Sequence, residues 1–287
     1  MGGVPLASRI LRAAPSRLVI ELAAAIATLA LASAVSRVIP HPHDAFFLVY
    51  APIAIPASFG VYVGLVRWLE RRGPLELALP GALRDLGLGL AIGTALFSMT
   101  IGVIALLGGY SIDGTASPTV LLAPLAMAAS SAFTEEIVAR GVVFRILEEW
   151  LGTWAALAFS GVLFGLAHIA NPHATVWSAL AIGIEAGPLL AAAYMLTRRL
   201  WLPIGIHAAW NYTQGAVFGV AVSGGKMTGL FHGTMRGPEW LSGGEFGAEA
   251  SAGAVVVCAL GAAILLAKAV RAGHVLAPSW VRRRRGA

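Results

Sequence analysis

Three apolar segments of the chain carry polar side chains that could together hydrolyse a peptide bond. The first contains the adjacent glutamates Glu135 and Glu136, the second ends at His168, and the third contains His207 and Asn211. A carboxylate can activate water as a general base, and imidazole or amide groups can stabilise an oxyanion. We therefore interpret Glu135, helped by His168, as the group that activates water. His207 and Asn211 would then stabilise the oxyanion of the tetrahedral intermediate.

The spacing of charged residues gives the two glutamates different roles. Glu136 and Arg140 are four residues apart, so in a helix they share one face and form a supporting ion pair. Glu135 projects about 100° away from Glu136, because an α-helix has 3.6 residues per turn. An unpaired carboxylate in a low-dielectric environment is ready to exchange a proton. The alternative is that the two glutamates only hold helices together.

The same side chains allow a second hydrolytic mechanism. Two histidines and one glutamate form the ligand set of some catalytic zinc sites, and Glu135, His168 and His207 supply these residue types. The zinc motif H-E-x-x-H is absent, so this alternative requires the three residues to converge in the fold. We favour the mechanism without a metal or other cofactor and keep zinc as the alternative.

The composition indicates where this chemistry takes place. Of the 287 residues, 58% are hydrophobic and 12% are charged. Soluble domains carry about 25% charged residues, so the composition is typical of a polytopic membrane protein and argues against a soluble enzyme. We predict an all-α bundle of about eight transmembrane helices. The expected spans are residues 18–39, 45–68, 86–107, 120–147, 154–170, 176–196, 202–222 and 251–270.

The basic residues predict the orientation of the bundle. With both termini inside, sixteen Lys and Arg residues fall on the inner side, beginning with Arg9, and only Arg37, Lys226 and Arg236 fall on the other. The positive-inside rule therefore predicts an N-in, C-in protein. The net charge of +6 then reports topology and not binding to nucleic acid. Residues 18–39 could be a cleaved signal, but we favour a retained signal anchor.

We divide the chain into four regions. Residues 1–119 contain the first three spans, residues 120–222 the catalytic core, residues 223–250 a Gly-rich external loop, and residues 251–287 the last span with a basic tail.

Arg outnumbers Lys eighteen to two, which with the Ala and Gly bias favours a GC-rich bacterial genome. We therefore expect an integral protein of the bacterial cytoplasmic (inner) membrane. Its expected partners are the lipid bilayer and a membrane protein or peptide substrate.

The ordered set of motifs resembles the CPBP family of intramembrane proteases, also called the CAAX protease or Abi family. This family includes the type II CAAX prenyl endopeptidases. The matching motifs are E-E-x-x-x-R at residues 135–140, F-x-x-x-H at residues 164–168 and H-x-x-x-N at residues 207–211. The resemblance implies an eight-span fold, a hydrophilic cavity open towards the cytoplasmic side, and peptide-bond hydrolysis in or near the membrane. Such proteins are described both as metalloproteases and as glutamic proteases.

The sequence leaves open the role of Glu185 and two other classes of protein. Glu185 lies in an expected span where small apolar residues are the norm. It could face the cavity and tune the site, pair with a histidine, or cap a kink at Pro188. The intramembrane ionisable residues also suit a proton-coupled transporter, although the inverted repeats of transporters are not evident. A non-catalytic membrane scaffold or immunity protein is the other alternative.

Overall fold

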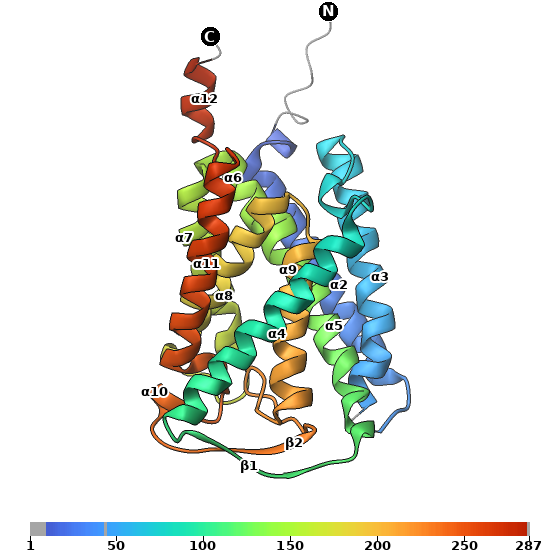
Figure 1. Cartoon of the computed structure of the whole chain (residues 1–287). Helices are drawn as coiled ribbons and strands as arrows, with labels where there is room; N and C mark the ends of the chain where they lie inside the picture. The colour runs from blue at the N-terminus through green and yellow to red at the C-terminus, as the bar shows by residue number, and fades with distance from the viewer. Residues whose placement is uncertain (1–9, 43–44, 286–287) are drawn as a thin grey trace, which may run out of the picture.

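The computed structural model describes residues 10–42 and 45–285 and shows a bundle of helices with one small sheet (Figure 1). Arg9 lies outside the described residues. The predicted fold class, an all-α membrane bundle, is confirmed. The longer helices are α2 (Ala14–Val38), α3 (Phe46–Leu65), α4 (Ala82–Leu106), α5 (Ala123–Glu136), α6 (Arg145–Leu151), α7 (Thr153–Ala167), α8 (Val176–Thr197), α9 (Trp201–Tyr212), α11 (Ala252–Arg271) and α12 (Ser279–Arg285).

Seven helical stretches of the described chain are long and apolar enough to cross a membrane, so the protein is an integral membrane protein. They are Ala14–Val38, Phe46–Glu70, Ala82–Leu106, Pro118–Leu151, Thr153–Ala170, Val176–Thr197 and Ala252–Arg271. The seventh expected span, residues 202–222, is shorter than predicted and is not among these seven stretches. It consists of the 12 residues of α9 and the five of a π-helical stretch, η7 (Thr213–Val217). A full span needs about 20 residues.

Helix α9 can be short because it lies inside the bundle, packed against α4 and α5 (Figure 1). Its contact with α4 is a close approach of two backbones. A Cβ atom added at Gly89 would lie 2.4 Å from the carbonyl oxygen of Leu202, and one at Gly93 would lie 2.2 Å from that of Ile206. Only glycine therefore fits at these positions of α4. The close contact fixes the depth and rotation of the helix that carries His207.

Helices α7 and α8 approach each other in the same way. A Cβ atom added at Gly165 would lie 2.2 Å from the carbonyl oxygen of Ala179, and one at Gly161 would lie 2.9 Å from that of Gly183. Small residues at helix crossings are typical of membrane bundles, where packing drives association. This contact holds the end of α7, where His168 lies, against α8.

The end of the bundle opposite the two termini carries the small sheet (Figure 1). Strand β1 (Tyr110–Thr115) pairs antiparallel with β2 (Phe231–Met235). The expected Gly-rich loop, residues 223–250, is thus ordered: it contains β2, the short helix α10 (Glu239–Ser242) and the turn η8 (Ala248–Ala250). The sequence shows no periodicity here, because one short strand and two single helical turns leave too few residues for a pattern.

The end that carries both termini is closed by buried ion pairs. Arg145 is one of the sixteen basic residues expected on the inner side, at the end of a span, but its side chain is only 5% exposed. Its Nη2 lies 2.5 Å from Oε1 of Glu70 and 3.3 Å from Oε2 of Glu21. Nη1 of Arg17 likewise lies 3.4 Å from Oε2 of the buried Glu70, and Arg17 also contacts the more exposed Glu149. The acidic partners neutralise Arg145 inside the protein, and Glu21 and Arg17 connect α2 to the rest of the bundle.

Candidate active site

The structure brings the predicted catalytic residues of three helices together. Glu135 lies in the last turn of α5, His168 directly follows α7, and His207 lies in the middle of α9. Oε2 of Glu135 is 3.8 Å from Nε2 of His168 and 4.0 Å from Nε2 of His207. The Glu135 side chain is 35% exposed, so the carboxylate is also open to a ligand.

The predicted span ends would place these residues at different depths. Counted at 1.5 Å per residue, Glu135 would lie roughly 20 Å deep and His207 roughly 8 Å. The two nevertheless meet in the folded bundle. Leu200, which precedes α9, is fully buried, and its backbone N–H donates to the carbonyl of Glu76, in the segment between α3 and α4. Counting residues from the expected span ends therefore does not give the relative depth of Glu135 and His207.

Glu136 forms the predicted ion pair and also makes a contact that was not predicted. Its Oε1 lies 2.7 Å from Nη1 of Arg140 and 2.9 Å from Nδ1 of His207. A carboxylate paired with arginine only accepts hydrogen bonds, so Nδ1 of His207 donates. Nε2 of the same ring is left to face Glu135. Glu136 therefore orients His207.

Arg140 is held from several sides. Its side chain is only 2% exposed, and its Nη2 donates to the carbonyls of Ala186 and Gly187 on α8, at 3.0 and 3.2 Å. The guanidinium also lies 4.5 Å from the centre of the Phe164 ring, a cation–π contact. Arg140 thus joins the glutamate helix to α7 and α8 while it neutralises Glu136.

The F-x-x-x-H spacing has a structural reason. Nδ1 of His168 lies 2.8 Å from the carbonyl oxygen of Phe164, one turn earlier. A carbonyl only accepts, so Nδ1 carries the proton, and in the neutral ring Nε2 keeps its lone pair. That lone pair is directed to the side on which Glu135 lies. His168 is therefore arranged to accept a proton or a hydrogen bond at Nε2.

Asn211 lies one turn beyond His207 on α9. Its Nδ2 donates to Oγ of Ser131 on α5, at 3.1 Å. An amide nitrogen has two N–H groups, so one of them is left for a ligand.

The helices that carry the glutamate pair and the His207–Asn211 pair both change from α-helical to π-helical structure near these residues. A π-helical stretch, η5 (Ile137–Phe144), follows Glu136, and η7 follows α9. Wide turns of this kind occur frequently at functional sites.

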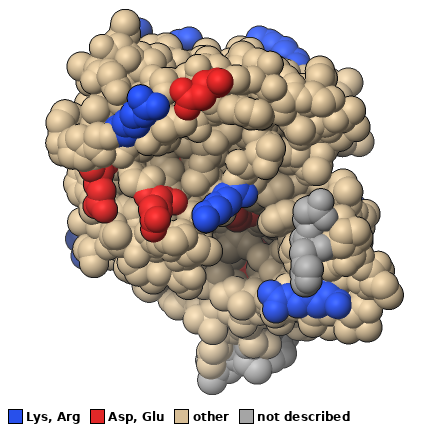
Figure 2. All heavy atoms as spheres, turned by 90° about the horizontal axis from the view of Figure 1, so that it is seen from below, with Lys and Arg blue, Asp and Glu red and all other residues tan. Residues whose placement is uncertain are grey.

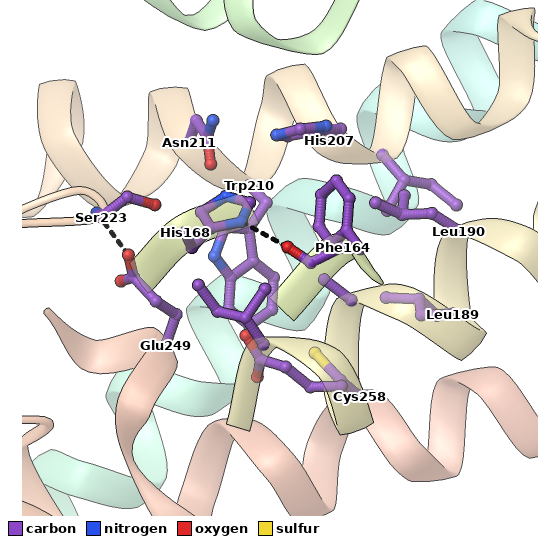
Figure 3. Close-up of a pocket in the computed structure, with 14 residues that line it drawn as sticks. Phe164, His168, Leu189, Leu190, His207, Trp210, Asn211, Ser223, Glu249 and Cys258 are labelled. Atoms are coloured by element: carbon purple, nitrogen blue, oxygen red, sulfur yellow. Dashed lines mark hydrogen bonds between the residues drawn. The ribbon is translucent and has the colours of Figure 1, made fainter. Parts of the chain in front are cut away.

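A cavity of about 50 Å³ lies behind the two histidines (Figure 3). Its polar lining includes side chains that were not predicted as site residues. Ser223 and Glu249 come from the Gly-rich loop, Trp210 from α9 and Cys258 from α11. Glu185, whose role was left open, lines the same cavity, is 2% exposed, and contacts neither histidine by a hydrogen bond in the described chain. The loop residues gave no sequence signal because the loop has no recognisable pattern.

Glu249 is buried although it lies outside the spans. It accepts hydrogen bonds from Nε2 of Gln214 and from the backbone N–H of Ser223. Burial raises the pKa of Glu249 to about 7, and these hydrogen bonds keep the pKa from rising further.

The site lies towards the end of the bundle that carries the sheet. Figure 2 views this end and shows a hollow with acidic atoms inside it. This view is from below Figure 1, and both termini lie at the opposite end of the bundle in Figure 1. An N-in, C-in protein with a cavity open to the cytoplasm, as the sequence and the family resemblance together led us to expect, does not fit this arrangement. If both termini are inside, the hollow faces outward.

The donor atoms of the site lie further apart than the ligands of a bound zinc ion. Ligands about 2.0–2.1 Å from a tetrahedral zinc ion lie about 3.3 Å from one another. The distances from Glu135 to the two histidines are longer, 3.8 and 4.0 Å. Within residues 10–42 and 45–285, no three His, Cys, Asp or Glu side chains are arranged to hold a metal ion.

Comparison with known families identifies the central part of the chain. Residues 117–213 match the sequence model of the type II CAAX prenyl endopeptidase Rce1-like family. This segment, about a third of the chain, is similar to that family. It contains Glu135, His168, His207 and Asn211, so the resemblance predicted from the motifs is confirmed, and the match indicates an intramembrane protease. No curated protein and no solved structure matches the chain.

Proposed function

We propose that this CAAX-protease-like protein is an endopeptidase in which Glu135 activates the attacking water. The proposal is supported above all by the convergence of Oε2 of Glu135 with Nε2 of His168 and Nε2 of His207. Their separations of 3.8 and 4.0 Å are too long for direct hydrogen bonds. One water that makes two bonds of about 2.8 Å at a tetrahedral angle joins atoms about 4.6 Å apart, so the Glu135 carboxylate has to move outward by less than about 1 Å to share a water with either histidine. The Glu135 side chain is 35% exposed and has room for that shift.

In the first step, Glu135 takes a proton from this water while the lone pair of His168 Nε2 helps to hold it. The water oxygen then attacks the carbonyl carbon of the scissile peptide bond. A tetrahedral intermediate forms, and its oxygen gains a negative charge. Glu135 now carries the proton that the leaving amine requires.

His207 and Asn211 stabilise the oxyanion. His207 donates Nδ1–H to Glu136, so it can donate from Nε2 only as an imidazolium. The carboxylate of Glu136 beside Nδ1, and that of Glu135 beside Nε2 before it takes the proton, favour that charged form. Asn211 supplies its second amide N–H. Glu135 then passes its proton to the amide nitrogen, and the C–N bond breaks.

The substrate class follows from the position of the site. The catalytic groups lie inside a bundle of membrane-spanning helices, so the peptide bond has to reach them from within or beside the membrane. We therefore assign a membrane-associated protein or peptide as the substrate. The bilayer is the other partner of the protein.

The proposal can be tested with purified protein in lipid nanodiscs. The protein is incubated with a diverse peptide library, and the new peptide termini are mapped by mass spectrometry. Wild type and Glu245→Gln should cleave the same peptides, because Glu245 is 82% exposed and lies outside the site. Glu135→Gln should cleave none. If a zinc chelator abolishes cleavage and added zinc restores it, the zinc mechanism replaces the metal-free mechanism. No cleavage by wild type would favour the scaffold.

A further inference from the structure

We propose that the cavity behind the histidines is a subsite for a primary ammonium group of the substrate, with Glu185 as its main ligand. The proposal rests on the peptidase function proposed above. It concerns which substrates are chosen, and it assigns no catalytic step to Glu185.

Glu185 is a buried carboxyl group with unused hydrogen-bonding capacity. It lies on α8, lines the cavity together with His168, His207 and Asn211, and is 2% exposed. Its Oε2 has no hydrogen-bond partner in the part of the chain that the structure describes. A buried, unpaired polar atom costs free energy, so an atom of this kind beside an active site indicates a missing ligand.

A second carboxyl group lines the same cavity. Glu249 differs from Glu185 because Gln214 and Ser223 already donate to it. No Lys or Arg is found among the described residues that line the cavity, and the carboxylates that its two histidines face are Glu135 and Glu136. The side chain of Glu249 faces the cavity from the side opposite α9 (Figure 3). Two carboxyl groups without a basic partner favour a positively charged ligand.

The size of the cavity favours an ammonium over a guanidinium group. Its volume of about 50 Å³ corresponds to roughly three to five water positions at about 10–15 Å³ each. An ammonium group is as compact as a water molecule and has three N–H donors, whereas the guanidinium is a larger planar fork. The ammonium would be either a lysine side chain or a free N-terminal amine.

A neutral Glu185 that serves only the packing of α8 is the competing explanation. The thiol of Cys258 on α11 lies beside Glu185 and can donate to it weakly. Glu185→Gln separates the two explanations, because glutamine has nearly the same shape as a protonated glutamate but no negative charge. Glu21→Gln is a matched control: Glu21 is also fully buried with one unpartnered oxygen, but it lies at the far end of the bundle.

The experiment uses the full chain in nanodiscs and three versions of one peptide library: unmodified, acetylated only on lysine, and acetylated only at the N-terminus. Wild type and Glu21→Gln should lose at least tenfold in kcat/KM with one of the acetylated versions. That version identifies the ammonium source. Glu185→Gln should lose as much with the unmodified library, mainly through KM, and should cleave the acetylated version as wild type does.

Equal cleavage of all three libraries by wild type would overturn the subsite and leave the peptidase function intact. The subsite would also be overturned if Glu185→Gln preferred the unmodified library over the acetylated one as strongly as wild type does. No cleavage by wild type would overturn the proposed function itself. If Glu185→Gln fails to fold, n-butylammonium should inhibit wild type competitively and n-butanol should not. Equal inhibition by both compounds would contradict an ammonium site.

Discussion

Glu136 holds His207 by a hydrogen bond of 2.9 Å between Oε1 and Nδ1 of the ring. The neighbouring residue, Glu135, faces the other ring nitrogen at 4.0 Å. Two adjacent glutamates of one helix can do this because successive side chains are about 100° apart. One carboxylate is fixed by Arg140 and orients the imidazole, and the other is free to react.

Arg140→Ala should destabilise the protein by about 3–5 kcal/mol, because it leaves Glu136 buried without a cationic partner. The change should appear as a lower folding yield and a lower unfolding temperature in detergent. Arg236→Ala is the control, since this side chain is 63% exposed. Normal yield and stability of Arg140→Ala would contradict the ion pair. Adding Glu136→Gln to Arg140→Ala should restore part of the stability, because the stranded charge is then removed.

Gly165→Ala should impair activity without touching any catalytic residue. The new Cβ atom would lie 2.2 Å from the carbonyl oxygen of Ala179, so α7 and α8 must separate. His168, which follows α7, would shift with the helix, and we expect at least a tenfold loss of cleavage together with a lower unfolding temperature. Gly102→Ala on α4 meets nothing within 4 Å and should be neutral or stabilising by up to about 1 kcal/mol. Equal behaviour of the two variants would show that the close helix contact is unimportant.

Glu249 should make the stability of the protein depend on pH. Its pKa rises from 4.5 to about 7 in the folded protein, so folding favours the protonated form. The stabilisation is complete below about pH 4.5 and is lost as the pH rises through about 7. Unfolding temperatures measured from pH 4.5 to 8 should fall less steeply in Glu249→Gln than in wild type. Parallel curves for the two proteins would contradict the raised pKa.

The side on which the hollow opens can be measured with single cysteines. Ile112 lies on β1 at the sheet end and is 50% exposed, and Ala272 is exposed near the end with both termini. The native Cys258 is buried. If both termini are inside, a membrane-impermeant thiol reagent added to intact cells should label Ile112→Cys and not Ala272→Cys. The reverse pattern would make the hollow cytoplasmic and show that the positive-inside rule misplaces the termini.

Much of the bundle could be predicted from hydropathy, because a helix in lipid needs a continuous apolar stretch. Residues 202–222 show the limit of that argument. A helix surrounded by protein does not need to match the bilayer thickness, and α9 ends after 12 residues before its π-helical extension. The strand at residues 110–115 was missed because Asp113 and Gly114 interrupt any alternation of apolar and polar residues.

In the site, too, contacts within one helix could be predicted from the sequence, whereas contacts between helices could not. The pair Glu136 and Arg140 follows from a spacing of four residues within one helix. The bonds from His207 to Glu136 and from Asn211 to Ser131 join residues 71 and 80 positions apart in sequence, and they depend on how α5 and α9 pack. The burial of Arg145 was not predicted for the same reason, since its partner Glu70 is 75 residues away.

The central claim, that Glu135 activates water for peptide-bond cleavage, is tested most directly in cells. The membrane and secreted proteins of cells with wild type, Glu135→Gln or Glu245→Gln are compared, and their new peptide termini are mapped. A small set of termini present with wild type and Glu245→Gln should be missing with Glu135→Gln, at equal protein levels in the membrane. Identical termini in all three strains would contradict the claim.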